Sequence, residues 1–170
     1  MSAPTLLLLR HAKSSWDEPD LEDHARPLAP RGRRDAAALG ARLARRRPAP
    51  GLVLCSTSQR TRETLALLDL PRQTPLRFEP KLYLASAETL LRRLRRLPAR
   101  ERSVLLIAHD PGLDQLARLL AGGGRPKALR RLAHGFVTGA LAELRAPAAG
   151  WRALAPGSAF LERFTRPRDL

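Results

Sequence analysis

The sequence predicts an α/β fold, a three-layer α/β/α sandwich around a mostly parallel sheet. Three short segments, residues 6–9, 52–56 and 103–109, are predicted to be strands. Apolar residues run without a break through 6–9, 52–55 and 104–108, as in strands buried on both faces of a sheet. Segments with helical periodicity separate these runs along the chain. Because strands and helices alternate, the helices are expected to cover both faces of the sheet.

The first apolar run leads into a polar segment and then a helix. Residues 14–30 contain three prolines and are expected to form a loop. A helix is predicted from Arg31, because Pro30 stands where a first-turn proline is tolerated and an alanine-rich run follows. The sequence RRRPAPG at 45–51 is expected to end this helix.

Two helices and a short strand are predicted after the second apolar run. The helix at 58–70 has hydroxyl groups at its start that can accept hydrogen bonds as N-caps. A short strand is predicted at 76–79. Residues 86–97 place leucines on one helical face and arginines on the other, and Ser86 caps this helix.

The third apolar run precedes a helix at 111–122, which begins with proline and ends with glycine. The sequence GGGRPK at 122–127 is expected to be loose chain. Two late strands are predicted at 138–146 and 151–157, and the tail after Gly157 is expected to be a surface extension.

Composition bounds the class of protein. The 170 residues, 44% of them apolar, are expected to form one domain over residues 1–170. The only cysteine, Cys55, excludes an internal disulfide and a CxxC metal pair. With no secretion signal and no apolar stretch of about 20 residues, the chain is expected to be cytoplasmic and free of membranes.

The chain is strongly basic, with 31 Lys and Arg against 16 Asp and Glu, a formal charge of +15. This charge favours acidic partners in solution. The arginine clusters at 45–47 and 92–96 are interpreted as solvated helix ends and faces. A nucleic-acid-binding module is the alternative reading, against which stand the low aromatic content of 4% and the lack of a nucleic-acid motif.

Polar side chains follow the three apolar runs at the point where each run ends. Arg10 and His11 follow the first run, Ser56 and then Arg60 follow the second, and His109 ends the third. Ligand sites in α/β proteins lie at the carboxyl ends of the strands. If these strands are parallel neighbours, two histidines and two arginines meet in one pocket.

Such a pocket suits phosphoryl transfer. Guanidinium groups bind phosphate oxygens with paired, charge-assisted hydrogen bonds. A neutral imidazole can attack phosphorus and hold it covalently, and a second imidazole can stabilise the charge of the transferring group. This chemistry depends on positioning and electrostatics, so neither a metal ion nor a cofactor is expected. The few His and Asp residues also lack the spacing of metal ligands.

Three segments resemble the histidine phosphatase superfamily, whose fold is of the phosphoglycerate-mutase type. LLLLRHAKS resembles its Arg-His motif, CSTSQRTRET its second phosphate-binding segment and IAHDPGL its second-histidine segment. DHARPLAPRGRRDA and LYLASAETLL are closer to the short SixA-type phosphohistidine phosphatases. These motifs occur in the family's order and, with similarities near the end of the chain, span residues 6 to about 164.

The resemblance implies roles for seven residues. His11 is the implied nucleophile, which forms a phosphohistidine intermediate. The other implied residues are the phosphoryl-binding Arg10, Arg60 and His109, and Asp23, Arg26 and Ser56, which border the site. His24 and His134 have no assigned partner and are expected to lie on the surface.

The sequence departs from the wider family in three places. Ala12 replaces a glycine, Thr57 stands where proline is frequent, and no residue clearly matches the glutamate that serves as general acid in mutase-like branches. Glu79 and Glu88 lie near the expected region without the right surroundings. An alcohol leaving group needs a proton, whereas an imidazole, with a reference pKa near ~6.5, departs readily once protonated.

The missing glutamate therefore favours a phosphoramidate substrate over a phosphate ester, although Asp23 stays open as a proton source. The predicted function is a metal-independent phosphatase, acting as a monomer on phosphohistidine of a signalling protein. One alternative is a phosphatase of the same superfamily that acts on a small phosphate ester. The other is a basic binding module without catalysis.

Overall fold

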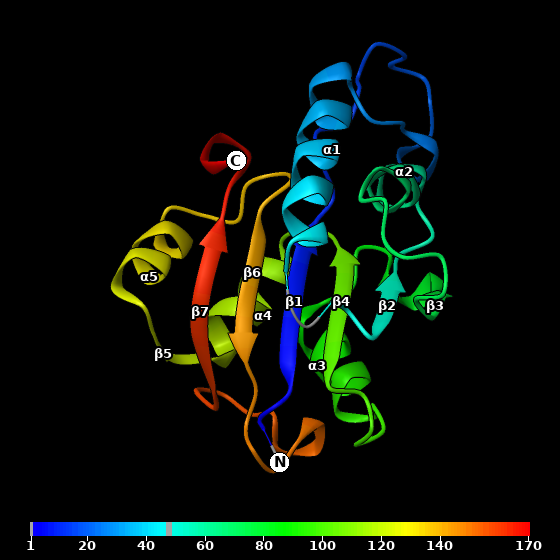
Figure 1. Ribbon diagram of the computed structural model, residues 1–170. Helices are drawn as coiled ribbons and strands as arrows, with labels where there is room; N and C mark the ends of the chain where they lie inside the picture. The colour runs from blue at the N-terminus through cyan, green and yellow to red at the C-terminus, as the bar shows by residue number, and fades with distance from the viewer. Residues whose placement is uncertain (1, 47–48) are drawn as a thin grey trace.

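The computed structural model describes residues 2–46 and 49–170, which form a seven-stranded sheet with helices on both faces (Figure 1). The strands are β1 (Thr5–Arg10), β2 (Leu52–Cys55), β3 (Leu76–Phe78), β4 (Ser103–Ala108), β5 (Ala121–Gly124), β6 (Leu141–Arg145) and β7 (Ala159–Thr165). The helices are α1 (Pro30–Ala44), α2 (Gln59–Leu67), α3 (Ala87–Arg95), α4 (Gly112–Leu120) and α5 (Pro126–Ala133). Short 3-10 helices are η1 (Asp23–Ala25), η2 (Pro80–Leu82), η3 (Trp151–Ala153) and η4 (Pro167–Asp169).

The sheet has the strand order β3-β2-β4-β1-β6-β7-β5 and is mostly parallel. β1 pairs in parallel with β4, and β2 pairs in parallel with β3 and β4. β6 runs antiparallel to both β1 and β7, and β5 pairs in parallel with β7. The predicted α/β class with a mostly parallel sheet is confirmed, and β6 is the strand that departs from it.

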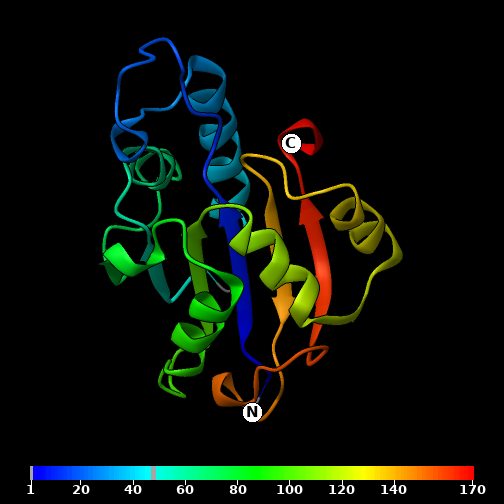
Figure 2. The ribbon, with the colours of Figure 1, turned by 180° about the vertical axis from the view of Figure 1, so that it is seen from behind.

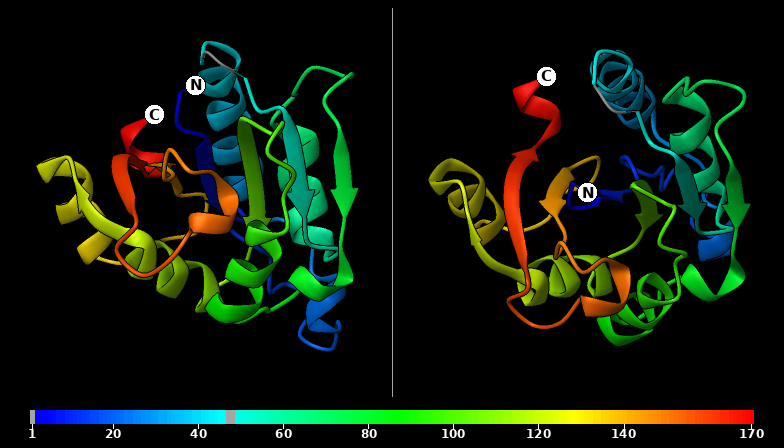
Figure 3. Two further views of the ribbon diagram at one scale, coloured as in Figure 1. Left: turned by 90° about the horizontal axis from the view of Figure 1, so that it is seen from below. Right: turned by 60° about the horizontal axis from the view of Figure 1, so that its bottom comes forward.

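Alternate residues of β1 enter the cores on opposite faces of the sheet. Leu6 and Leu8 pack in the core that α3, α4 and α5 cover, while Leu7 and Leu9 pack in the core under α1 and α2. Figures 2 and 3 show these two helical layers on either side of the sheet. All four leucines are fully buried, which accounts for the continuous apolar run.

The end of the chain differs from the sequence prediction. Residues 151–153 form η3 rather than a strand, with Trp151 buried and its Nε1–H donating to the carbonyl of Glu101 at 2.7 Å. The last strand is β7, inside the segment predicted to be a surface extension. Leu161 and Phe164 of β7 are buried, and β7 lies between β6 and β5. Both predictions were wrong, and β7 was missed because its buried apolar positions are interrupted by Glu162 and Arg163.

The glycine-rich stretch is also more ordered than predicted. Ala121–Gly124 forms β5 at the edge of the sheet, and α5 follows it directly. A Cβ atom on Gly122 would lie 1.9 Å from the carbonyl oxygen of Gly157, so the close approach of these two backbones requires glycine. The glycine-rich composition alone predicts an irregular segment here and gives no sign of this close backbone packing.

The predicted loop at 14–30 holds η1 and a single antiparallel bridge between Ser14 and Leu28. α1 ends at Ala44, near its predicted end, but residues 47 and 48 of the predicted 45–51 boundary lie outside the described residues. In the described part of the chain, no helix is long and apolar enough to cross a membrane.

Candidate active site

The carboxyl ends of β1, β2 and β4 bring the predicted histidines and Arg60 together. Arg10 pairs with Ala108 in the parallel β1–β4 ladder, so the residues that follow, His11 and His109, are neighbours. Their ring centroids lie 5.3 Å apart. Ser56 follows β2, and its Oγ lies 2.7 Å from Nε2 of His109. The predicted convergence of the strand ends is therefore present.

The His11 imidazole is buried and has one nitrogen directed to other polar groups. Nδ1–H donates to the carbonyl of Ala12 at 2.8 Å, which leaves the lone pair on Nε2. Nε of Arg60 donates to this Nε2 at 3.3 Å. Burial and, to a lesser extent, the nearby charges of Arg60 and Arg10 lower the pKa of His11 to about 4, despite the Ala12 hydrogen bond. His11 is thus a neutral imidazole near pH 7.

The Arg60 guanidinium is the centre of the cluster and is 5% exposed. Besides His11 it contacts Nδ1 of His109 at 3.3 Å, the carbonyl of Asp23 at 2.6 Å and the Asp23 carboxylate at 3.0 Å. This fork ties both histidines to η1. Four of its five N–H groups are therefore directed at acceptors.

The position of Arg60 is fixed by the start of α2. Ser58 caps α2 by accepting from the backbone N–H of Thr61. Thr64 Oγ1 donates to the carbonyl of Arg60 and accepts from the N–H of Ala12, directly after His11. The helix and the end of β1 are thereby held in register, which sets the distance between Arg60 and His11.

His109 is 1% exposed and is also neutral. Burial first, and then the nearness of His11 and Arg60, lower the pKa of His109 to about 3. Because Arg60 donates to Nδ1, the proton of the neutral ring is on Nε2 and donates to Ser56 Oγ. Arg60 therefore fixes the tautomer of this ring, and the contact with Ser56 helps to orient it.

Two contacts outside the Arg60 cluster hold the Arg10 guanidinium. Its Nη1 donates to the carbonyl of Phe136 at 2.8 Å and lies 3.0 Å from Oδ2 of Asp110. Burial raises the pKa of Asp110, an effect that the charge of Arg10 opposes. Asp110 was not among the predicted site residues, although its place next to His109 in the sequence is a signal for it.

An exposed rim covers one side of the cluster. The Tyr83 hydroxyl donates to the Asp23 carboxylate, and the Tyr83 ring lies edge-on to His109 with centroids 5.3 Å apart. His24 packs edge-on against Tyr83 and lies 3.0 Å from Thr57 Oγ1. His24 is exposed, as predicted, and the structure identifies these partners for it. Tyr83 was missed because it follows a three-residue edge strand that gives no sign of the site.

Arg26 lies in the first loop rather than in the cluster. Its guanidinium donates to the carbonyls of Glu18 and Pro19, each at 3.1 Å, and stacks over Trp16 at 3.9 Å. The side chain is buried by these contacts. The structure thus brings Arg10, His11, Ser56, Arg60, His109 and Asp23 together and gives Arg26 contacts within the loop that carries Asp23.

The two glutamates near the expected general-acid region are engaged elsewhere. Glu79 forms a paired contact with Arg93, with N–O distances of 2.7 and 2.8 Å. Glu88 pairs with Arg92 one turn along α3, and its side chain is 82% exposed. Among the described residues, no group of three or more His, Cys, Asp or Glu side chains could hold a metal ion.

Two neutral histidines and two arginines gather at the carboxyl edge of the mostly parallel sheet, an arrangement that suits phosphoryl transfer. The chain belongs to the histidine phosphatase superfamily (branch 1), whose family model matches residues 6–83. An uncharacterized protein of Mycobacterium tuberculosis is 38% identical over 162 residues, 94% of this chain and 100% of that relative. The family and the fold support a phosphatase.

Solved structures agree with the family. A protein of Nakamurella multipartitia, provisionally assigned as the phosphohistidine phosphatase SixA, superposes with a TM-score of 0.85 at 31% identity and covers 98% of both chains. A second SixA, also provisionally assigned, from Agrobacterium tumefaciens gives a TM-score of 0.82 at 27% identity, over 98% of this chain and 100% of that one. The phosphoglycerate-mutase-like fold is therefore established.

Proposed function

We propose that this protein removes the phosphoryl group from phosphohistidine on a signalling protein, through a phosphohistidine intermediate on His11 and without a metal ion. The observation that carries this proposal is the protonation state of the two imidazoles and the carboxylate in the site. Both imidazoles are neutral, and the carboxylate nearest to them is ionised. The site therefore has a nucleophile and cations for phosphate, but it lacks a protonated carboxyl beside Arg60.

His11 acts as nucleophile through Nε2. Its Nδ1–H is committed to the Ala12 carbonyl, so the lone pair lies on the nitrogen that faces Arg60. In the first step Nε2 forms a bond to phosphorus while the phosphorus–nitrogen bond of the substrate breaks. A proton from solvent on the other ring nitrogen of the substrate lets its imidazole leave as a neutral group.

Arg60, Arg10 and His109 bind the phosphoryl oxygens. The low pKa of His109 arises from burial and from neighbouring positive charge. A phosphoryl dianion supplies negative charge at the same place, so its arrival favours a proton on Nδ1 of His109. The protonated ring then donates a hydrogen bond to the transferring group, as charge stabilisation requires.

Water completes the cycle. It attacks phosphorus, a phosphorus–oxygen bond forms, and the bond to Nε2 of His11 breaks. Inorganic phosphate leaves as H2PO4⁻ with both protons of the water, and His11 returns to its neutral form with its proton on Nδ1. The leaving group of this step is again an imidazole, so neither step expels an alkoxide.

Asp23 is better suited to placing Arg60 than to donating a proton. Burial raises the pKa of Asp23, but the hydrogen bonds from Tyr83 and Arg60 outweigh this and lower it overall. The carboxylate is ionised at neutral pH and accepts from both partners. An alkyl phosphate ester would need a proton for its leaving oxygen that Asp23 does not hold, whereas phosphohistidine would not.

One observation favours the alternative of a small phosphate ester as substrate. The pKa of Asp110 is raised by burial, and its carboxyl lies 3.0 Å from Arg10 at the edge of the pocket. Such a reaction would use Asp110 as its acid. The variant Asp110→Asn separates the two functions, because only ester hydrolysis depends on this proton.

The test compares phosphate release from a phosphohistidine peptide and from phosphoserine, an unactivated alkyl phosphate, with His11→Ala as control. The proposal predicts a kcat/KM for phosphohistidine at least about 100-fold higher, the scale of general acid catalysis, and lost in the control. Faster release from phosphoserine that Asp110→Asn abolishes supports the ester phosphatase. Absence of release from either substrate by folded protein supports the binding module.

A further inference from the structure

A basic cavity of about 380 Å³ lies beside the segment that carries His11. Its walls come from the start of α1, the loop between α5 and β6, and η4. The lining residues used below are Lys13, Arg31, Asp35, Val137, Arg166 and Arg168. We propose that this cavity, called here the basic pocket, docks an acidic segment of the phosphoprotein substrate. This inference rests on the proposed function and names the chemistry of its protein partner.

The basic pocket is continuous with the catalytic segment. Lys13 is two residues after His11, so their Cα atoms are at most about 7 Å apart. Gly135 and Val137 line the pocket, and the carbonyl of Phe136 between them accepts from Arg10. A protein interface covers about 800 Å² on each partner, which is enough to span the pocket and the site together.

Two of the four Lys and Arg side chains that line the basic pocket have no ion-pair partner in the described part of the chain. Within residues 2–46 and 49–170, neither Lys13 nor Arg168 lies within ion-pair distance of a carboxylate, and both are exposed. Arg31 is 74% exposed and lies 3.7 Å from Asp35, the one carboxylate among the lining residues. Cations that lack partners attract carboxylates of another molecule, and they suit an acidic segment.

Two further features suit a protein partner. Arg166 is held rigidly by two contacts of 3.0 Å to the carboxylate of Asp169, so one wall of the pocket is preorganised. Val137 is 42% exposed amid the cations. An apolar centre with a charged rim is the usual anatomy of a protein interface.

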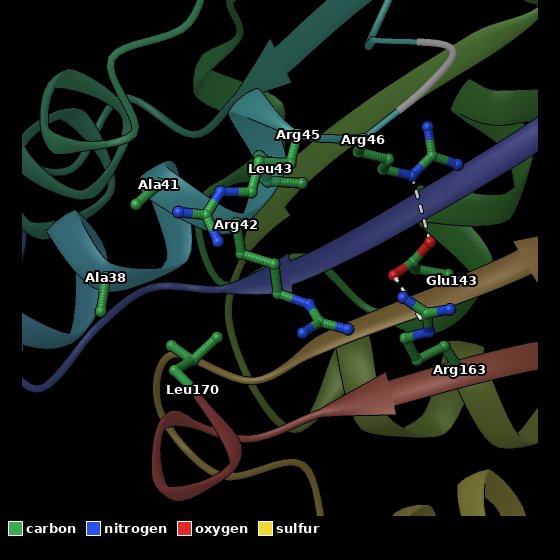
Figure 4. Close-up of a pocket in the computed structure, with 9 residues that line it drawn as sticks. All are labelled: Ala38, Ala41, Arg42, Leu43, Arg45, Arg46, Glu143, Arg163 and Leu170. Carbon is green, nitrogen blue, oxygen red and sulfur yellow. Dashed lines mark hydrogen bonds and ion pairs between the residues drawn. The ribbon is translucent and has the colours of Figure 1, made fainter.

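A second basic groove provides a matched comparison (Figure 4). It has a volume of about 490 Å³ and lies between the end of α1 and the exposed face of β6 and β7. Arg42 and Arg45 line it, and Glu143 in its floor pairs with Arg46 at 3.1 Å. This groove lies along the face of the sheet, away from the carboxyl edge where His11 is. Reversing its charges changes the total field without touching the basic pocket.

The test uses two synthetic peptides that each carry one phosphohistidine, flanked by aspartates in one and by asparagines in the other. Wild-type protein is expected to prefer the aspartate peptide by about tenfold in kcat/KM at low ionic strength, with the preference falling as salt is added. The double variant Arg31→Glu and Arg168→Glu is expected to lose the preference while hydrolysing the asparagine peptide normally. The control Arg42→Glu and Arg45→Glu, of equal net charge, is expected to keep it.

Each result decides the proposal. Equal loss in both double variants overturns it, because the effect then comes from the net charge. A preference that persists in Arg31→Glu and Arg168→Glu, or is absent from the wild type, also overturns it. If neither peptide releases phosphate, the proposed function fails, and docking is read from the fluorescence anisotropy of the labelled, unphosphorylated aspartate peptide. Affinity that depends on Arg31 and Arg168 then supports the pocket, and unchanged affinity overturns it.

Discussion

The candidate active site has a buried part, called here the floor, and an exposed part, called here the rim, and different contacts hold the two in place. The floor consists of His11, Arg60 and His109, each at most 7% exposed, and hydrogen bonds join each histidine to Arg60. The rim consists of Asp23 and Tyr83, and the Asp23 side chain is 48% exposed. Burial in the floor sets protonation states, whereas the rim keeps its groups solvated. We infer that the floor determines the chemistry of the site and that the rim adjusts it.

The largest expected effect comes from the arginine of the floor. Arg60→Ala removes the donors shared by both imidazoles and is expected to lower kcat/KM by about 10²–10³-fold. Arg60→Lys should restore little, because a point charge cannot replace the planar fork that reaches His11, His109 and Asp23. Steady-state kinetics with a phosphohistidine peptide measure kcat/KM for both variants. Recovery by lysine to near the wild-type value would contradict the role of the fork.

The protonation of the floor predicts a dependence of stability on pH. The pKa values of His11 and His109 are lowered to about 4 and about 3, whereas the unfolded chain binds these protons near ~6.5. The contribution of the neutral rings is complete above pH ~6.5 and is lost as the pH falls through ~6.5 toward 4, since the unfolded state then binds more protons.

Urea unfolding at pH 7.5 and 5 measures this effect. The free energy of unfolding should be lower at pH 5 than at pH 7.5 in the wild type. This decrease should be smaller in His109→Gln. His134→Gln serves as the matched control, because His134 is exposed and its ring contacts the carbonyl of Arg130 rather than the floor. An equal change in both variants would show that burial of His109 is not the cause.

The first loop predicts an effect on stability rather than on chemistry. Arg26→Ala leaves the carbonyls of Glu18 and Pro19 without their donor, which should lower the free energy of unfolding by about 1–3 kcal/mol. The kcat on a phosphohistidine peptide should change only a few-fold, because Arg26 acts through the loop that carries Asp23. A loss of kcat as large as that of Arg60→Ala, in a variant of unchanged stability, would place Arg26 in the floor.

The smallest effect is expected at the rim. Tyr83→Phe removes the hydroxyl that donates to Asp23 and should lower kcat/KM by about threefold to tenfold, the equivalent of one hydrogen bond. The same change should raise the pKa of Asp23 toward its ordinary value, which NMR titration measures. An unchanged pKa would mean that Arg60 alone holds the carboxylate.

The same contrast explains what could be predicted from the sequence. His11 and His109 end continuous apolar runs, and parallel pairing makes the ends of such strands converge, so the floor could be inferred from local pattern. Tyr83 reaches the site through a short edge strand, and Arg26 folds back onto its own loop. Their positions depend on tertiary packing that no periodicity records. β7 was missed for a related reason, since two charged residues break its apolar pattern.

The most direct test of the account is the position of the phosphoryl group on the enzyme. The hydrogen bond from Nδ1–H of His11 to the Ala12 carbonyl leaves the lone pair on Nε2, the proposed nucleophile. Rapid denaturing quench of a reaction with a phosphohistidine peptide, followed by mass spectrometry and NMR of the trapped protein, locates the group. The expected result is a single phosphohistidine at His11, substituted on Nε2. Phosphate on Nδ1, on His109 or on no residue during rapid turnover would contradict it.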